Sequence, residues 1–163
     1  KKRNSFFNTR QIHIAGERLS LDDIEHRLLR RSKIKWSLGY LNKWFPAVFE
    51  KEQRVETVDY RIHFTLNCGA KSCPPIAFYK PEQLNMQLDM ATKAYLQSEA
   101  EYKESENTVK LPVVMGWFRG DFGGKKKMVA LLHSLQIVPE EKRPVLKFEG
   151  YNWNLLLENY QSE

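Results

Sequence analysis

The segment from His63 to Pro75 constrains the fold of this chain more than any other. It holds both cysteines, Cys68 and Cys73, together with one of the four histidines and two consecutive prolines. The residues at 61–66 alternate in polarity and include β-branched and aromatic side chains, which predicts a strand. Since proline cannot continue a ladder of backbone hydrogen bonds, we expect the strand to end in a turn that carries the two thiols.

Thiol catalysis is the first of three alternatives for this turn. A free cysteine is only slightly ionised at neutral pH, so a nucleophilic thiol needs a base or a cationic neighbour. We predict Cys68 as the nucleophile, because backbone N–H groups of the following turn could stabilise an oxyanion, whereas Cys73 precedes two prolines. His63 and His26 are the candidate bases. In a strand, His63 lies about 16 Å from Cys68 and on the opposite face, so their pairing requires a sharp turn at Asn67.

A disulfide and a zinc site are the other two alternatives. Four residues, one of them glycine, separate Cys68 from Cys73, so a bridge between them is compatible with disulfide geometry. Closing so small a loop contributes about 2 kcal/mol and suits an oxidising compartment. The spacing His63-x4-Cys68-x4-Cys73 is slightly wide for zinc, and a fourth ligand would have to be His26, His13 or an acid. We expect neither a metal nor another cofactor.

Composition and charge argue against two classes of partner. The 163 residues suit one domain with its own core, and no apolar run is long enough to cross a bilayer. The net charge of +6 raises the question of nucleic acid, but the basic residues are scattered among acids, so we expect no nucleic-acid binding. Trp36, Tyr40 and Trp44 recur at helical spacing among lysines, which predicts the buried stripe of a helix over about residues 36–49.

We expect an α+β fold in a single domain over residues 1–163, with helices packed on a small, mainly antiparallel sheet. The strand at 61–66 and a hairpin formed by residues 145–157 should share that sheet, with Ile62, Phe64 and Leu66 buried. The N-terminal residues are basic but are not followed by an apolar stretch, so we expect no signal peptide in this sequence, which a mature form or a fragment would also lack.

Helix signals are clear at three places. Ser20 is a good N-cap with acidic residues in the first turn after it, and Pro81 opens a helix whose expected apolar face is Leu84, Leu88, Ala91 and Tyr95. The sequence Gly123-Gly124 precedes a third helix, which carries Met128, Leu131, Leu132 and Leu135. The remaining expected elements are a short strand at 11–14, a strand at 108–111 and a short helix at 113–118. Asp121 is expected to be a helix cap or a hydrogen-bonded turn residue.

Five segments of the chain resemble the family catalogued as domain of unknown function 547. They are residues 19–26, residues 59–75, Tyr79 with the helix at 83–96, residues 117–122 and residues 151–153. They occur in the family's order and cover nearly the whole chain from about Ile14 onward. The usual upstream helix of that family, with a Trp-Ile-Asn-x-Tyr-Asn type of segment, has no counterpart before Gly16, so we expect an N-terminally truncated chain.

The resemblance implies membership of the family but not a particular activity, because the family has no settled function. Its members are mostly bacterial and often exported, which implies a periplasmic or extracellular location. A relation to papain-like cysteine peptidases would imply an α+β fold with a thiol nucleophile, and the family motif places Glu25 beside His26.

Two functions are therefore expected as alternatives. The first is a thiol-dependent hydrolase or acyl transferase that acts on a small-molecule or peptide substrate, with Cys68 as nucleophile. The second is a non-catalytic structural or interaction module of an exported protein, with a Cys68–Cys73 disulfide. On the first hypothesis, Cys68→Ser abolishes activity, whereas Cys73→Ser leaves most of it.

Overall fold

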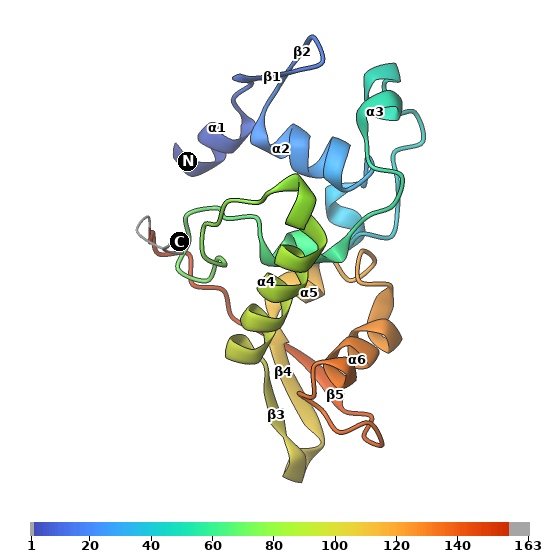
Figure 1. Cartoon of the computed structure of the whole chain (residues 1–163), viewed down its shortest axis with the longest axis vertical. Coiled ribbons are helices and arrows are strands. Elements are labelled where there is room, and N and C mark those ends of the chain that lie inside the picture. The colour runs from blue at the N-terminus through green and yellow to red at the C-terminus, as the bar shows by residue number, and fades with distance from the viewer. Residues whose placement is uncertain (1, 157–163) are drawn as a thin grey trace. The chain divides into compact units, whose positions relative to one another are not determined.

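The computed structural model describes residues 2–156, with side chains from Ser5 onward. The chain divides into two compact units, Lys1–Asp59 and Tyr60–Glu163. Both contain helices and short strands (Figure 1), so the predicted α+β class is confirmed. The single-domain organisation stays a prediction. Within residues 2–156, no helix combines the length and the apolar character needed to cross a bilayer.

The first unit is built from short elements. In chain order they are α1 (Lys2–Asn8), β1 (Ile12–Ile14), β2 (Glu17–Leu19), α2 (Leu21–Asp23), the π-helical turn η1 (Ile24–Leu29), the 3-10 turn η2 (Lys35–Ser37) and α3 (Val48–Gln53). Strands β1 and β2 form an antiparallel hairpin. Ala15 and Gly16 connect them, both with positive φ, as the tightest hairpin turns require.

Helix α2 begins at Ser20, as the sequence predicts. The Ser20 hydroxyl accepts a hydrogen bond from the Asp23 N–H at 3.0 Å, and the Asp23 carboxylate accepts one from the Ser20 N–H at 3.0 Å. This reciprocal capping box satisfies two backbone donors that a helix start leaves unpaired. The helix continues as η1 and ends where Arg31 and Ser32 adopt left-handed conformations.

The predicted helix over residues 36–49 is wrong. Only η2 and the first residues of α3 are helical there, and the segment between them is a loop closed by an antiparallel bridge between Lys33 and Asn42. Leu38 and Gly39 both have positive φ, which interrupts a right-handed helix. The predicted buried stripe is consequently exposed: Trp36 and Trp44 have 77% and 85% of their surface accessible.

The second unit is organised around a three-stranded sheet. Its elements are η3 (Tyr60–Phe64), η4 (Pro81–Gln83), α4 (Leu84–Glu99), β3 (Glu101–Lys103), η5 (Glu104–Glu106), β4 (Thr108–Pro112), α5 (Val113–Trp117), α6 (Gly124–Ser134) and β5 (Val145–Glu149). Strand β4 is central, antiparallel to β3 and parallel to β5 (Figure 1). Of the three strand pairings among residues 2–156, two are therefore antiparallel.

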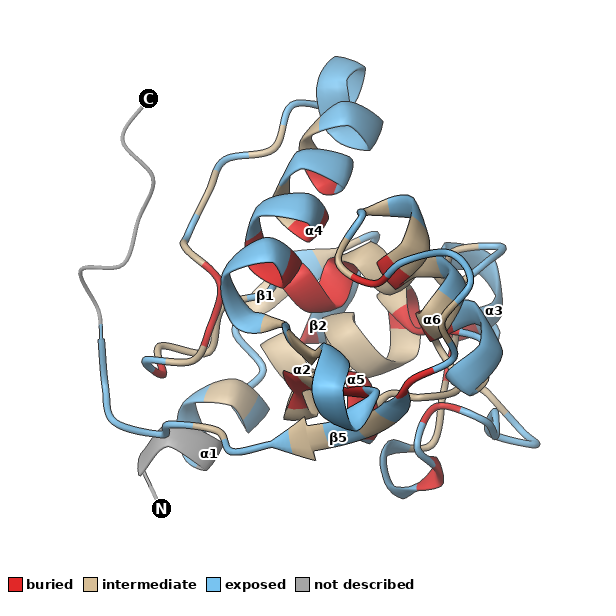
Figure 2. Cartoon of the chain, turned by 90° about the horizontal axis from the view of Figure 1, so that it is seen from below, coloured by how far each residue is buried: buried red, intermediate tan, exposed pale blue. Residues whose placement is uncertain are grey.

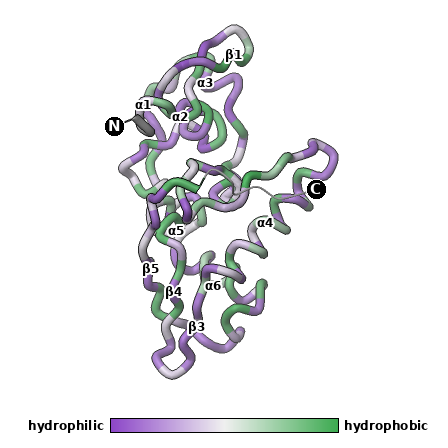
Figure 3. Tube along the Cα trace, turned by 90° about the vertical axis from the view of Figure 1, so that its left-hand side faces the viewer, coloured by the Kyte–Doolittle hydropathy of each residue, from purple (hydrophilic) through white to green (hydrophobic). Residues whose placement is uncertain are grey.

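The main hydrophobic core belongs to the second unit. Its buried members are Phe64, Tyr95, Leu96, Val109, Leu111, Met115, Phe122, Met128, Leu132 and Val138. Buried patches recur along α4 in Figure 2, and apolar and polar stretches alternate along it in Figure 3, as expected of an amphipathic helix. The expected face of α4 is correct for Leu88 and Tyr95, but Leu84 is exposed and Leu96 is buried instead.

The predicted strand at 61–66 is wrong, because Tyr60–Phe64 forms the 3-10 turn η3. No strand pairs with this segment in the described part of the chain, and η3 instead packs against α4. Packing on a helix buries the three consecutive residues Ile62, His63 and Phe64, which a strand with one face in solvent would not do. Leu66, also predicted to be buried, is exposed.

The predicted C-terminal hairpin is also wrong as far as the structure describes it. Val145–Glu149 is a strand, but its partner is β4, which runs parallel to it. Residues 151–156 do not pair with β5. Instead, Leu155 forms an isolated antiparallel bridge with Ala70, in the cysteine loop. Residue 157, the last of the predicted hairpin, lies outside the described residues.

Candidate thiol site

The loop after η3 carries both cysteines, and Asn67 folds it back on itself. The Asn67 side chain accepts a hydrogen bond from the Gly69 N–H at 2.6 Å and donates one to the Pro74 carbonyl at 2.5 Å. Gly69 has a φ of 75°, in the left-handed region that favours glycine. The two bonds join the start of the loop to its end, so the side chains of Cys68 and Cys73 meet.

The segment after β5 lies along this loop. The Lys71 N–H donates to the carbonyl of Asn154 at 2.8 Å, and Ala70 pairs with Leu155. These backbone contacts hold residues 151–155 beside the cysteine loop. The hydroxyl of Tyr151, the first of these residues, therefore reaches both sulfurs. The site therefore joins residues that are about eighty positions apart in sequence.

Three hydrogen-bonding groups surround the sulfur of Cys73. Cys68 Sγ lies 2.8 Å from Cys73 Sγ, the Cys68 N–H donates to Cys73 Sγ at 3.0 Å, and Tyr151 Oη lies 3.0 Å from the same sulfur. Tyr151 Oη is 3.3 Å from Cys68 Sγ. Both cysteines are free thiols, Cys73 buried and Cys68 partly exposed. Donors concentrated on one sulfur stabilise its thiolate form.

The pKa values of the two thiols move apart. The hydrogen bond from Cys68 lowers the pKa of Cys73 to about 5, against the opposing effect of burial and with help from Tyr151. The same contact, followed by burial, raises the pKa of Cys68. Burial, and then the hydrogen bonds to the two sulfurs, raise the pKa of Tyr151, so its hydroxyl remains protonated and can donate. The pair therefore holds one proton between two sulfurs, with the negative charge favoured on Cys73.

Aromatic rings hold Tyr151 in place. Its ring lies 4.4 Å from the ring of Trp153 and 5.2 Å from that of Trp117, both tilted, and Trp117 and Trp153 stack at 5.7 Å. Trp117 is the last residue of α5, so the tyrosine is positioned by the helix as well as by the loop. Contacts of this kind restrict the ring to one orientation and aim its hydroxyl at the sulfurs.

His63 pairs with Asp121 rather than with Cys68. His63 Nε2 lies 2.9 Å from Asp121 Oδ2, both side chains are buried, and the His63 ring stacks on Phe118 at 4.1 Å. Cys68 Sγ lies within hydrogen-bond distance of Cys73 Sγ and Tyr151 Oη, and the Cys68 N–H donates to Cys73 Sγ. Asp121 is thus the hydrogen-bonded turn residue that the sequence predicts, with a histidine as its partner.

His26 and Glu25 lie in the first unit, on η1. Arg30 Nη1 lies 2.8 Å from His26 Nδ1, and since a guanidinium can only donate, this ring nitrogen is the acceptor. The Glu25 carboxylate is 3.9 Å from the same nitrogen, and Asp22 is 3.7 Å from Nε2. The predicted catalytic residues are therefore divided between the two units.

Comparison with protein families gives one result. The family model described as protein of unknown function, DUF547, matches residues 1–96. The chain belongs to this family. The match begins ahead of Gly16, where no family motif was identified, and it includes the cysteine loop. It ends before residues 117–122 and 151–153, which contributed to the resemblance seen in the sequence. Searches of the curated proteins and of the solved structures found no match.

In this DUF547 chain, sequence reasoning missed two partners of the site. Tyr151 contacts both thiols and Asp121 contacts His63, although both belong to segments that resemble the family. The sequence spacing of Tyr151 and of Asp121 did not indicate their partners, because both contacts join segments that are far apart in sequence and meet only in the folded chain. The zinc alternative gains no support: within residues 2–156, no cluster of three or more His, Cys, Asp or Glu side chains is placed to hold a metal ion.

Proposed function

We propose that this DUF547 chain is a thiol-dependent hydrolase or acyl transferase with Cys73 as the nucleophile. The observation that carries the proposal is the position of Cys73 Sγ, which accepts the Cys68 N–H and lies within hydrogen-bond distance of the Cys68 thiol and the Tyr151 hydroxyl. A thiolate that persists at neutral pH is the form that attacks an acyl carbon. The sequence pointed to Cys68 for this role. The donor geometry favours Cys73, because its stabilising groups come from Cys68 and Tyr151 rather than from the residues after it.

The chemistry follows from the shared proton. Cys73 Sγ forms a bond to the acyl carbon, and the leaving group departs with the proton of the Cys68 thiol. Water, or another acceptor with a hydroxyl or amine, then attacks the thioester and returns a proton to Cys68. The bond from carbon to Cys73 Sγ breaks, and the thiolate–thiol pair is restored. Tyr151 holds the thiolate in place throughout, because its hydroxyl keeps its own proton.

The substrate proposed for this site carries a small acyl group on a small molecule or a peptide. Pro74 and Pro75, directly after Cys73, line a cavity of about 190 Å³ with Phe64, Tyr79 and Tyr95 among its other walls. This volume is below the 300–1,000 Å³ of typical ligand pockets, so it suits a short apolar group. Cys68 is the proposed acid and base, and His63, held by Asp121, stays a candidate for an assisting role.

Alkylation of each cysteine as a function of pH tests the proposal. Iodoacetamide with mass-spectrometric detection should modify Cys73 with a midpoint near pH 5 in the intact protein. Turnover of a generic activated ester should be lost in Cys73→Ser and reduced in Cys68→Ser. Loss in Cys68→Ser alone would restore the assignment made from sequence, and full turnover in both variants would end the thiol-enzyme proposal.

The second candidate function is a non-catalytic module of an exported protein with a Cys68–Cys73 disulfide. The distance of 2.8 Å between the sulfurs favours it, because little movement would bring them to bonding distance. Oxidised glutathione would take up the two hydrogens as two molecules of reduced glutathione. Intact mass before and after alkylation under non-reducing conditions decides: a bridged protein takes up no alkyl group and shows no ester turnover after reduction.

A further inference from the structure

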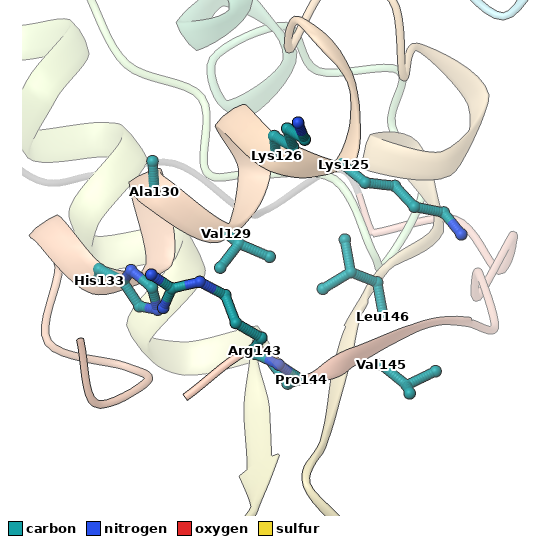
Figure 4. A pocket seen from close by; sticks show the side chains of 9 residues that line it. All are labelled: Lys125, Lys126, Val129, Ala130, His133, Arg143, Pro144, Val145 and Leu146. Carbon is teal, nitrogen blue, oxygen red and sulfur yellow. The ribbon is translucent and has the colours of Figure 1, made fainter. Parts of the chain in front are cut away.

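A groove in the second unit shares no residue with the thiol site. It has a volume of about 570 Å³ and lies between α6 and the chain that leads into β5 (Figure 4). This volume falls within the range of pockets that hold small ligands. The lining residues are Lys125, Lys126, Val129, Ala130, His133, Arg143, Pro144, Val145 and Leu146.

The groove is basic and has no acidic residue in its lining. Other basic residues of the sheet, such as Lys110 and Lys147, form ion pairs with glutamates. Within the described residues, Lys125, Lys126 and Arg143 form no ion pair, although their side chains are exposed. Three positive charges without a carboxylate partner therefore surround one groove, and an anion could neutralise them without displacing any existing ion pair.

At one end of the groove, the side chains of Arg143 and His133 bond to the same backbone carbonyl. The carbonyl of Lys142 accepts hydrogen bonds from Arg143 Nη1 at 2.8 Å and from His133 Nε2 at 3.1 Å. A carbonyl can only accept, so Nε2 carries the proton and Nδ1 faces away from this bond. Arg143 Nη1 also donates to the Glu140 carbonyl at 2.5 Å. These bonds restrict the guanidinium and the imidazole to one region, and an arginine held in this way is suited to a phosphate or a carboxylate.

The middle of the groove is apolar. Val129 on α6 and Leu146 on β5 point toward each other in Figure 4, and Ala130 and Pro144 are also among the lining residues. Lys125 and His133 are eight residues apart on the same helix, which corresponds to about 12 Å along its axis. The groove thus offers a cationic end, an apolar centre and further positive charge toward the start of α6.

We propose that this groove binds a small amphipathic anion: a phosphate or carboxylate head held by Arg143, with an apolar body over Val129 and Leu146. The proposal does not depend on the thiol chemistry. It requires both parts of the ligand, because the charges alone would bind inorganic phosphate equally well, and the apolar centre alone would not distinguish an anion from a cation.

Calorimetric titration of the full chain with four probes tests the site. Hexyl phosphate and hexanoate should bind, and the stronger of the two identifies the head group. Inorganic phosphate should bind at least about tenfold more weakly than hexyl phosphate, because it lacks the methylene groups. Hexylammonium should not bind. Arg143→Gln should weaken hexyl phosphate about tenfold or more, as expected for loss of a charge-assisted hydrogen bond.

Lys127→Gln is the matched control, because Lys127 lies on the same helix but does not line the groove. It should change binding by less than about twofold, the small effect expected of an exposed charge. A second variant, Val129→Ser, removes apolar surface under the ligand body and should weaken hexyl phosphate without touching the bonds around Lys142. Equal loss in Lys127→Gln, equal binding of hexylammonium, or unchanged binding in both groove variants with native circular dichroism would overturn the proposal. Binding of a single-stranded oligonucleotide that excludes hexyl phosphate would reassign the groove to nucleic acid.

Discussion

The proton between Cys68 and Cys73 decides the chemistry of the thiol site. Two sulfurs at 2.8 Å cannot both be ionised, so stabilising one thiolate keeps the other thiol protonated. The Cys68 N–H and the Tyr151 hydroxyl tip the balance toward a charge on Cys73. The thiolate is then present above about pH 5 and is lost as the pH falls through that value.

The variant Tyr151→Phe tests this balance at a single residue. Removing the hydroxyl takes away a donor at 3.0 Å from Cys73 Sγ, so the pKa of Cys73 should rise by about one unit or more. Ultraviolet absorbance of the thiolate against pH measures the change. Tyr102→Phe is the control, because its hydroxyl bonds to Asn107 and not to a sulfur. An unchanged midpoint in Tyr151→Phe would mean that the hydroxyl does not stabilise the thiolate.

At the scale of secondary-structure elements, sequence patterns predict correctly where all the interacting residues lie within a few positions of one another. The capping box at Ser20 uses only residues within one turn of helix, and the hairpin turn at Ala15 and Gly16 needs only two left-handed residues. The strand predicted at 61–66 is wrong: the segment alternates as a strand does, but no strand within residues 2–156 pairs with it. A strand is stable only when a second strand provides hydrogen-bond partners for its backbone, and the local sequence of 61–66 cannot show whether that second strand exists.

The capping box predicts both a stability change and a pH dependence. Ser20→Ala should lower the free energy of unfolding by about 1 kcal/mol in urea denaturation. Burial alone would raise the pKa of Asp23, but hydrogen bonds from Ser20 and Arg27 lower it below its usual 3.8. Its contribution is therefore present above the usual pKa and is lost as the pH falls through the lower, folded value.

Asp23→Asn should accordingly flatten the loss of stability below about pH 4. Ser98→Ala is the control for the serine variant, because the Ser98 hydroxyl donates to a carbonyl within α4 and caps no helix start. Equal destabilisation by Ser20→Ala and Ser98→Ala would show that the cap has no special role.

Because the loop between η2 and α3 is exposed, substitution of its aromatic residues should have little effect on stability, whereas substitution in a buried helix would destabilise the protein. Trp44→Ser should change the free energy of unfolding by less than about 0.5 kcal/mol, because 85% of the Trp44 surface is already accessible. Phe64→Ala, at a position 1% exposed, should cost about 3–5 kcal/mol in the same urea titration. A comparable cost for Trp44→Ser would indicate that the loop is covered in the folded protein.

At the scale of the whole molecule, the two units differ in what they bury. The second unit holds the core described above, whereas in the first unit the described side chains that are both apolar and buried are Leu19 and Leu28. The buried polar or charged side chains of this unit, among its described residues, are Ser20, Arg30, Ser32, Ser37 and Glu50. Apolar burial is the main contribution to folding free energy, so the two units should differ in independent stability.

Fragments divided at the unit boundary test this difference. Residues 60–163 should retain a cooperative unfolding transition by circular dichroism, and residues 1–59 should not, because the smaller fragment buries too little apolar surface. The family match over residues 1–96 crosses this boundary. A fragment of residues 60–163 that is unfolded in buffer would contradict the expectation and would favour the single domain predicted from sequence.

Several features of this protein are determined by the sequence itself. The α+β class, the helix start at Ser20, the helices after Pro81 and Gly124, the strand at Thr108–Pro112 and membership of the DUF547 family all follow from local patterns. These patterns are sufficient because caps, amphipathic periods and glycine turns act within a few residues of the backbone. The sequence also identified the loop with Cys68 and Cys73 as the candidate functional site.

Only the tertiary structure decided how distant segments meet. Tyr151 reaches the thiols because the segment after β5 returns to the cysteine loop, and Asp121 reaches His63 across 58 residues of sequence. The same is true of the parallel partner of Val145–Glu149 and of the exposure of Trp44. In each case the free energy comes from contacts between segments far apart in sequence, and no local period in the sequence encodes which segments those are.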